Sequence, residues 1–102
     1  MICCSFIFRP GTYDEEFYRL DDEIMDFCRT LDGFIKTEVW FSADGKTKNA
    51  MYFFEDMASV KKLAGFPTHV QAKIQSERWY DAFRVDIFEL QRSYGDSELS
   101  PS

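Results

Sequence analysis

Residues 34–55 read FIKTEVWFSADGKTKNAMYFFE and contain two runs of strand-forming residues around a turn signal. The first run, residues 34–41, is rich in β-branched and aromatic side chains, and the second, residues 49–55, follows the pair Asp44-Gly45. An Asp-Gly pair between two such runs is typical of a β-hairpin. What lies on each side of this hairpin decides the fold.

The segment before the hairpin has the periodicity of an amphipathic helix. Apolar residues recur at helical spacing and charged residues occupy the opposite side. Thr12 and Glu15 form a T-x-x-E capping box, and Gly33 ends the pattern. The clustered carboxylates Asp21, Asp22, Glu23 and Asp26 lie along the solvated side without a second kind of ligand, so no metal site is predicted there.

The segment after the hairpin predicts a broken helical crossover. Asp56 can cap a short helix that Gly65 ends. A further helix begins near Pro67, with a second possible capping box at Thr68, and runs to about Arg78.

Apolar runs at residues 2–8 and 83–90 supply a strand at each end of the chain. The order βαββαβ predicts an α+β, ferredoxin-like sandwich with an antiparallel sheet. We expect one domain over residues 1–95 and a loosely ordered tail at 96–102, which is rich in serine.

Composition narrows the possible partners. A net charge of -6, with no local cluster of Lys and Arg, disfavours nucleic acid and anionic membranes. Residues 1–5 lack the features of a secretory signal, which favours the cytoplasm. The odd number of cysteines, three, and their spacing predict neither a disulfide framework nor a metal site.

Both faces of the predicted sheet are apolar, although both helical crossovers cover the same face. In the first strand Cys4, Phe6 and Phe8 oppose Cys3 and Ile7. In the second strand Phe34 and Trp40 oppose Ile35, Val39 and Phe41. Monomers rarely expose so large an apolar surface, so a homodimer through the sheet face is expected. Coverage by the tail or by an edge loop is the alternative.

The most specific part of the sequence runs from Phe66-Pro67-Thr68-His69 to Trp79-Tyr80 and continues through residues 83–90 to Tyr94-Gly95. This part resembles the closing segment of antibiotic biosynthesis monooxygenase domains. These domains belong to the dimeric α+β barrel superfamily, and the resemblance spans nearly all of residues 2–95. It implies a dimer and a pocket between the helices and the sheet. Some members of the superfamily carry out cofactor-independent oxygenation of quinol-like compounds there, and others degrade haem.

The chain departs from both kinds of relative. Haem-degrading relatives carry an Asn on the first strand, and residues 2–8 contain none. Monooxygenase relatives often place Asn and Trp on the third strand, where this chain has Asn49 and Tyr52.

His69 is the one histidine of the sequence and a candidate catalytic residue. At the start of a helix the dipole favours a neutral imidazole, which can act as a base or bind a metal. On a helical projection His69 groups with Ala72, Ser76 and Tyr80, so it can face a cavity. The alternative is a histidine that caps the helix or packs near Pro67.

Tyr52 is the second candidate catalytic residue, as a proton acceptor. Aromatic residues with polar groups suit a pocket for a flat ligand, and an arginine can hold an anion. The expected substrate-binding residues are Trp40, Phe66, Trp79, Tyr80 and Arg84. Packing in the core, or for Arg84 a simple ion pair, is the alternative for each.

The leading functional hypothesis is a dimer that binds a small aromatic or quinone-like molecule and oxygenates it without a cofactor. A haem-binding or haem-degrading enzyme with His69 as the iron ligand is the first alternative. A non-catalytic ligand-binding dimer, or a structural dimer with a filled pocket, is the second.

Overall fold

The computed structural model describes residues 1–96 and 98–99 and has the predicted order of elements. The strands are β1 (Ile2–Pro10), β2 (Phe34–Phe41), β3 (Lys48–Phe54) and β4 (Tyr80–Glu89). The helices are α1 (Glu15–Thr30), α2 (Met57–Ala64), α3 (Pro67–Ile74) and α4 (Ser76–Trp79).

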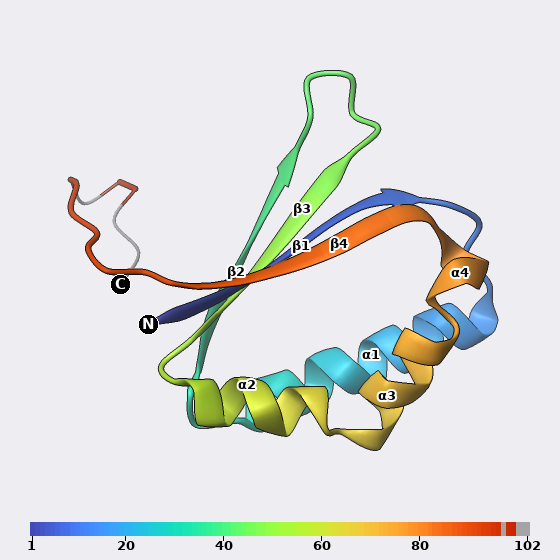
Figure 1. The fold of residues 1–102 in the computed structure, drawn as a ribbon, viewed down its shortest axis with the longest axis horizontal. Helices are drawn as coiled ribbons and strands as arrows, with labels where there is room; N and C mark the ends of the chain where they lie inside the picture. Colours follow the sequence, from blue (N-terminus) through green and yellow to red (C-terminus); the bar gives the residue numbers. More distant parts are fainter. Residues whose placement is uncertain (97, 100–102) are drawn as a thin grey trace.

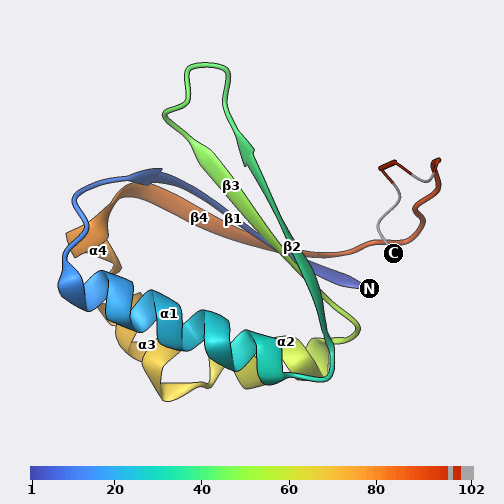
Figure 2. The same ribbon diagram turned by 180° about the vertical axis from the view of Figure 1, so that it is seen from behind.

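The four strands form one antiparallel sheet in the order β2-β3-β1-β4. The long helices lie together on one face of this twisted sheet, and the tip of the β2–β3 hairpin extends away from them (Figures 1 and 2). The ferredoxin-like βαββαβ fold is therefore confirmed. Pairing of the sheet with a second copy stays a prediction.

Strand register assigns side chains to the two faces of the sheet. Cys4 pairs with Tyr52 and with Ile87, and these side chains face the helices. Cys3 pairs with Phe53 and Phe88, which therefore lie on the opposite, open face.

A register shift between Phe34 and Lys36 changes the predicted alternation of β2. Phe34 packs on the helix side, and after the irregularity Val39 again falls on that side because it pairs with Ala50. The prediction that Phe34 and Trp40 share a face is wrong for this reason.

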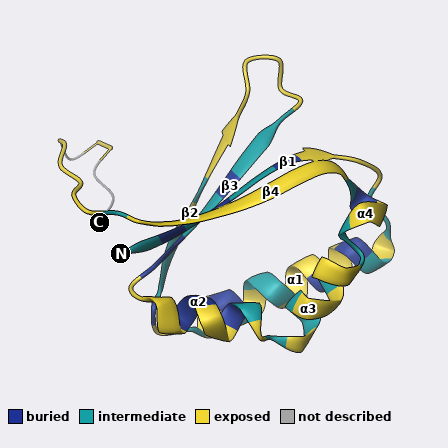
Figure 3. Cartoon of the chain, in the orientation of Figure 1, coloured by how far each residue is buried: buried dark blue, intermediate teal, exposed yellow. Residues whose placement is uncertain are grey.

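The core lies between the helices and the sheet in two clusters (Figure 3). The first is built around Cys28, Phe54, Val60 and Leu63, and the second around Phe17, Leu20 and Trp79. Each fully buried large apolar side chain contributes roughly 1.5–3 kcal/mol to stability. The two clusters hold opposite ends of α1 against the rest of the chain.

The residues that cap the helices differ in part from the prediction. Asp14 caps α1, because its Oδ1 accepts a hydrogen bond from the backbone N–H of Phe17 at 2.9 Å, so the predicted box beginning at Thr12 is wrong. The cap at Asp56 is confirmed by its bond to the N–H of Ser59. No side chain caps α3, and the Thr68 hydroxyl instead donates to Glu23.

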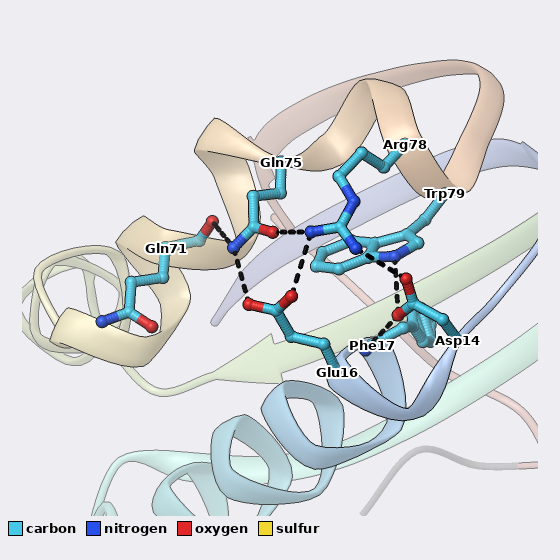
Figure 4. A network of polar contacts seen from close by, with 7 residues as sticks. All are labelled: Asp14, Glu16, Phe17, Gln71, Gln75, Arg78 and Trp79. Carbon is cyan, nitrogen blue, oxygen red and sulfur yellow. Dashed lines mark hydrogen bonds and ion pairs between the residues drawn. The ribbon is translucent and has the colours of Figure 1, made fainter.

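The last predicted helix is shorter than expected because it breaks at Gln75, and β4 already begins at Tyr80. A polar network holds α4 against the start of α1 (Figure 4). Arg78 donates to Asp14 at 2.7 Å, to Glu16 at 3.0 Å and to Gln75. Gln75 in turn donates to Glu16 at 3.2 Å.

The predicted tail, residues 96–102, lies partly outside the described residues, which omit 97 and 100–102. Among the residues that the structure describes, no helix has both the length and the apolar character needed to cross a membrane.

Candidate functional site

A cavity of about 420 Å³ lies between the helices and the sheet. Its walls are largely apolar and come from every strand except β2 and from α1, α2, α3 and α4. The main apolar wall residues are Phe6, Ile24, Val60, Leu63, Ala72, Phe83, Val85 and Ile87. The cavity is large enough for a small flat molecule.

The β4 side of this cavity is open. Phe83, Val85 and Ile87 each keep about half of their surface exposed, at 50%, 54% and 51%. Figure 3 shows β4 coloured as exposed along nearly its whole length. A ligand can therefore reach the cavity along β4 without a rearrangement of the core.

A small group of polar side chains interrupts the apolar walls. Asp21 comes from α1, Tyr52 from β3, His69 and Lys73 from α3, Ser76 from α4 and Tyr80 from β4. A small number of polar groups on largely apolar walls is typical of small-molecule sites. The helical projection of His69, Ala72, Ser76 and Tyr80 correctly placed all four on one surface, since each lines the cavity.

His69 presents an imidazole nitrogen that is free to accept a proton. Its Nδ1 atom is buried and has no hydrogen-bond partner among the described residues. Burial lowers the pKa of His69, the positive charge of Lys73 lowers it further, and a hydrogen bond with the backbone of Ala64 raises it. The imidazole is therefore neutral at pH 7.

The two tyrosines of the cavity have the opposite character. Burial, with a smaller contribution from the charge of Asp21, raises the pKa of Tyr52 to about 12. Burial also raises the pKa of Tyr80, with Tyr13 and Asp21 adding to the effect. Both phenols keep their protons at pH 7, so they are hydrogen-bond donors, and the expectation of Tyr52 as a proton acceptor is not favoured.

Asp21 is exposed to solvent, as the sequence predicted, and it also lines the cavity, which the sequence analysis missed. The signal was present in the spacing: Asp21, Ile24 and Cys28 recur at helical intervals, and all three line the cavity. Burial raises the pKa of Asp21, as does the charge of Asp22, and Lys48 acts in the opposite direction.

The two tryptophans lie outside the cavity. Trp79 is 2% exposed, packs against Phe17 with ring centroids 5.4 Å apart, and donates its indole N–H to Asp14. Trp40 is 61% exposed on β2 and pairs with Asn49 on the open face. Trp79 therefore belongs to the core and Trp40 to the outer surface, so neither of these two predicted substrate-binding residues lines the cavity.

Phe66 and Arg84 also lie outside the cavity. Phe66 stacks on Phe27, with ring centroids 4.0 Å apart and planes 4° from parallel. Arg84 is on the open face and forms an exposed ion pair with Asp86 at 3.2 Å, which is the simpler of the two alternatives weighed for it. Tyr80 alone of the five predicted substrate-binding residues lines the cavity.

Asn49 does not supply the polar group that its place on β3 suggested. It lies on the open face, where its Oδ1 accepts a hydrogen bond of 2.8 Å from the Ser5 hydroxyl. The alternation of β3 sends Tyr52, three residues later, to the cavity instead.

The cysteines are unreactive in this environment. Cys4 and Cys28 line the cavity, and burial raises the pKa of Cys28 to about 11. Cys3 lies on the other face, and burial raises its pKa to about 11 as well. Within the described part of the chain, no group of His, Cys, Asp and Glu side chains is arranged to hold a metal ion.

Comparison with known proteins finds similarity in structure and not in sequence. No protein-family model matches the chain, and no curated protein sequence matches it.

Several solved structures share the fold over nearly the whole chain. Rv0793 from Mycobacterium tuberculosis has a TM-score of 0.71 and 17% identity, covering 92% of this chain and 98% of that one. A mutant of SnoaB, a cofactor-independent oxygenase from Streptomyces nogalater, has a TM-score of 0.72 and 11% identity, covering 93% and 97%. A provisional antibiotic biosynthesis monooxygenase from Deinococcus radiodurans has a TM-score of 0.68 and 11% identity, covering 94% and 98%.

Proposed function

We propose that the cavity of this chain binds a flat, largely apolar aromatic molecule and that the protein oxygenates this molecule without a bound prosthetic group. The chain has the fold of antibiotic biosynthesis monooxygenase domains, as the resemblance of its closing segment predicted, and at these identities the likeness establishes the fold alone. The observation that carries the proposal is the neutral imidazole of His69, whose buried Nδ1 has no hydrogen-bond partner among the described residues and lies in an apolar cavity of about 420 Å³.

The proposed reaction needs little from the protein besides a base and a dry cavity. His69 accepts a proton from the bound substrate, and the electron-rich anion that results reduces O2 directly. A substrate with two hydrogens at the reacting carbon reacts as SH2 + O2 → S=O + H2O, so one oxygen atom enters the product and the other leaves as water. A flat substrate that covers the open β4 side of the cavity would itself displace water from the apolar walls around the reacting anion.

Tyr52 and Tyr80 have complementary roles in this proposal. Both are protonated at pH 7, since burial raises the pKa of each. Their hydroxyl groups can therefore donate to the negative oxygen that develops on the substrate. An acceptor at His69 and donors at the tyrosines suit an aromatic substrate that becomes an anion.

The comparison with SnoaB supports this chemistry over others. SnoaB is described as a cofactor-independent oxygenase and shares the fold over 93% of this chain. Its activity is carried over to this chain as a proposal, because a fold hosts many functions and only the cavity residues can decide among them.

Oxygenation of anthrone tests the proposal. Its methylene group would become the second carbonyl of anthraquinone, with one O2 consumed for each molecule. We expect O2 uptake and anthraquinone formation above the rate in buffer, and a loss of about 100-fold or more of the catalysed rate in His69→Ala. Arg29→Gln, at an exposed ion pair of α1 outside the cavity, is the matched control and should keep the wild-type rate. A wild-type rate equal to that in buffer would overturn the proposal for this substrate class.

Haem binding is a second candidate, because the same free nitrogen of His69 could ligate iron inside an apolar cavity. Lys73 also lines the cavity and could meet a haem propionate, whereas Asp21 would repel one. Titration with haemin separates the two candidates. A Soret band that is lost in His69→Ala would support haem binding, and an unchanged haemin spectrum would exclude it.

We also propose that the open face of the sheet pairs with a second copy. Phe88, at 45% exposure, and Trp40, at 61%, lie on this face beside Ile7 and Met51. Apolar side chains across several strands favour a protein partner, and a second copy presents the same surface. The charged and polar pairs Arg84–Asp86 and Ser5–Asn49 would give that pairing its register.

A further inference from the structure

The carboxylate of Asp21 is a polar group in the cavity that the proposed proton transfer does not use. It lies on the same stripe of α1 as Ile24 and Cys28, and these residues line the cavity together. Among the described residues, Asp21 has neither a hydrogen bond nor an ion pair. Asp21 is exposed, so water solvates this carboxylate in the free protein, and a ligand that displaces this water has to supply a hydrogen-bond donor in its place.

Asp21 also lies near the phenol groups of the cavity. Its charge raises the pKa of three tyrosines, Tyr13, Tyr52 and Tyr80, of which the latter two line the cavity. None of these hydroxyl groups donates to Asp21 in the structure of residues 1–96 and 98–99. The acceptor positions of this carboxylate are therefore open to a bound molecule.

We propose that Asp21 determines ligand specificity: it accepts a hydrogen bond from a hydroxyl group of a neutral aromatic ligand and repels aromatic carboxylates. This inference rests on the proposed function, because it requires that the cavity binds an aromatic molecule. Lys73 also lines the cavity, so the lining carries one positive and one negative side chain and has no net charge. A neutral ligand with a hydroxyl donor therefore suits the cavity better than a cation.

The test compares two probes with the same ring system, 1-naphthol and 1-naphthoate, by isothermal titration calorimetry on the full chain at pH 7. At this pH the first is neutral and donates a hydrogen bond, and the second is an anion without a donor. We expect the wild-type protein to bind 1-naphthol at least tenfold more tightly than 1-naphthoate. This comparison needs no variant, so it holds whether or not a substitution folds.

Two variants then assign the preference to one side chain. Asp21→Asn removes the charge and should reduce the preference for 1-naphthol about tenfold, mainly through tighter binding of 1-naphthoate. Asp22→Asn removes the neighbouring exposed carboxylate, which does not line the cavity, and should leave the preference unchanged. Circular dichroism checks that both variants are folded.

The outcomes separate the inference from the function on which it rests. Equal wild-type affinities for the two probes, or a preference unchanged in folded Asp21→Asn, would overturn the role of Asp21 and leave aromatic binding intact. Loss of the preference in Asp22→Asn as well would mean that general surface charge causes it, which also overturns the inference. If neither probe binds the wild-type protein, the proposed function fails and the inference fails with it.

Discussion

The indole Nε1–H of Trp79 donates a hydrogen bond to Oδ1 of Asp14 across 3.1 Å, joining the end of α4 to the residue that caps α1. The same oxygen of Asp14 accepts from the N–H of Phe17, and its other oxygen accepts from Arg78 at 2.7 Å. One carboxylate thus fixes the start of α1, the place of Trp79 and the point from which β4 departs. Because β4 carries one wall of the cavity, this contact also positions the candidate site.

Replacement of Asp14 by Ala should lower the melting temperature by several degrees. The variant loses the helix cap and leaves the indole N–H of Trp79 buried without its acceptor. Thr12→Ala is the matched control, because the structure gives Thr12 no capping role, and it should melt like the wild type. Thermal unfolding followed by circular dichroism measures both. A larger effect at Thr12 than at Asp14 would contradict the observed cap.

Stability should fall as the pH decreases from about 7 toward 5, in part because of His69. Burial lowers the folded-state pKa of His69 below the value of about 6.5 in the unfolded chain. Between these two values the unfolded chain binds more protons, so the free energy of unfolding decreases as the pH falls through that window. His69→Gln removes this contribution.

Denaturant unfolding at several pH values measures the effect of His69. The difference in unfolding free energy between wild type and His69→Gln should change across this window and be constant above it. A pH-independent difference between wild type and His69→Gln would mean that His69 is solvated.

Asp14 contributes to the pH dependence at lower pH. Hydrogen bonding from the N–H of Phe17 lowers the pKa of Asp14, so the stabilisation by this carboxylate is lost only as the pH falls through that lowered value.

Tyr52→Phe should slow anthrone oxygenation by about 10- to 100-fold while it preserves the fold, since it removes one donor for the developing oxyanion. Its ring remains in contact with the first core cluster, so stability should change little. Trp40→Phe is the control, because Trp40 lies outside the cavity. Equal rates for the wild type and Tyr52→Phe would remove Tyr52 from the mechanism.

The open face of the sheet gives a prediction about assembly. We expect a dimer at micromolar concentration in light scattering after size exclusion, and a monomer for Phe88→Asp, which places a charge on that face. Ile74→Asp places a charge on the exposed side of α3 and should remain dimeric. A monomeric wild type, or a folded and dimeric Phe88→Asp variant, would contradict this use of the face. Val39 is unsuitable for this test, because register places it on the helix side of the sheet.

The order of elements could be predicted from the sequence because long periodic segments dominate it. The stripe of α1 and the Asp44-Gly45 turn are local signals, and both match the structure. Asp21 lies on the same side of α1 as Ile24 and Cys28. Its assignment from the sequence rested on its charge and did not consider this position. Spacing was the better guide there, as it was for His69.

The sheet face on which a side chain lies, and the residues against which it packs, depend on contacts between distant parts of the chain, which a local sequence pattern does not predict. The irregularity after Phe34 reverses the phase of β2, so the face of Trp40 could not be counted from the start of the strand. Trp79 has the polar group expected of a binding residue, but its partner, Asp14, is 65 positions away in the sequence. Similarly, Phe66 stacks on Phe27, a pairing that only the packing of α1 against the α2–α3 connection produces.

The most direct test of the central claim, that the cavity beside His69 is a ligand site, is an NMR titration of the 15N-labelled protein with 1-naphthol. The account predicts that the largest amide shifts cluster at Tyr52, His69 and Tyr80, with little change at Trp40 and Arg84 on the open face. Shifts confined to the open face, or a spectrum unchanged at saturating 1-naphthol, would contradict it.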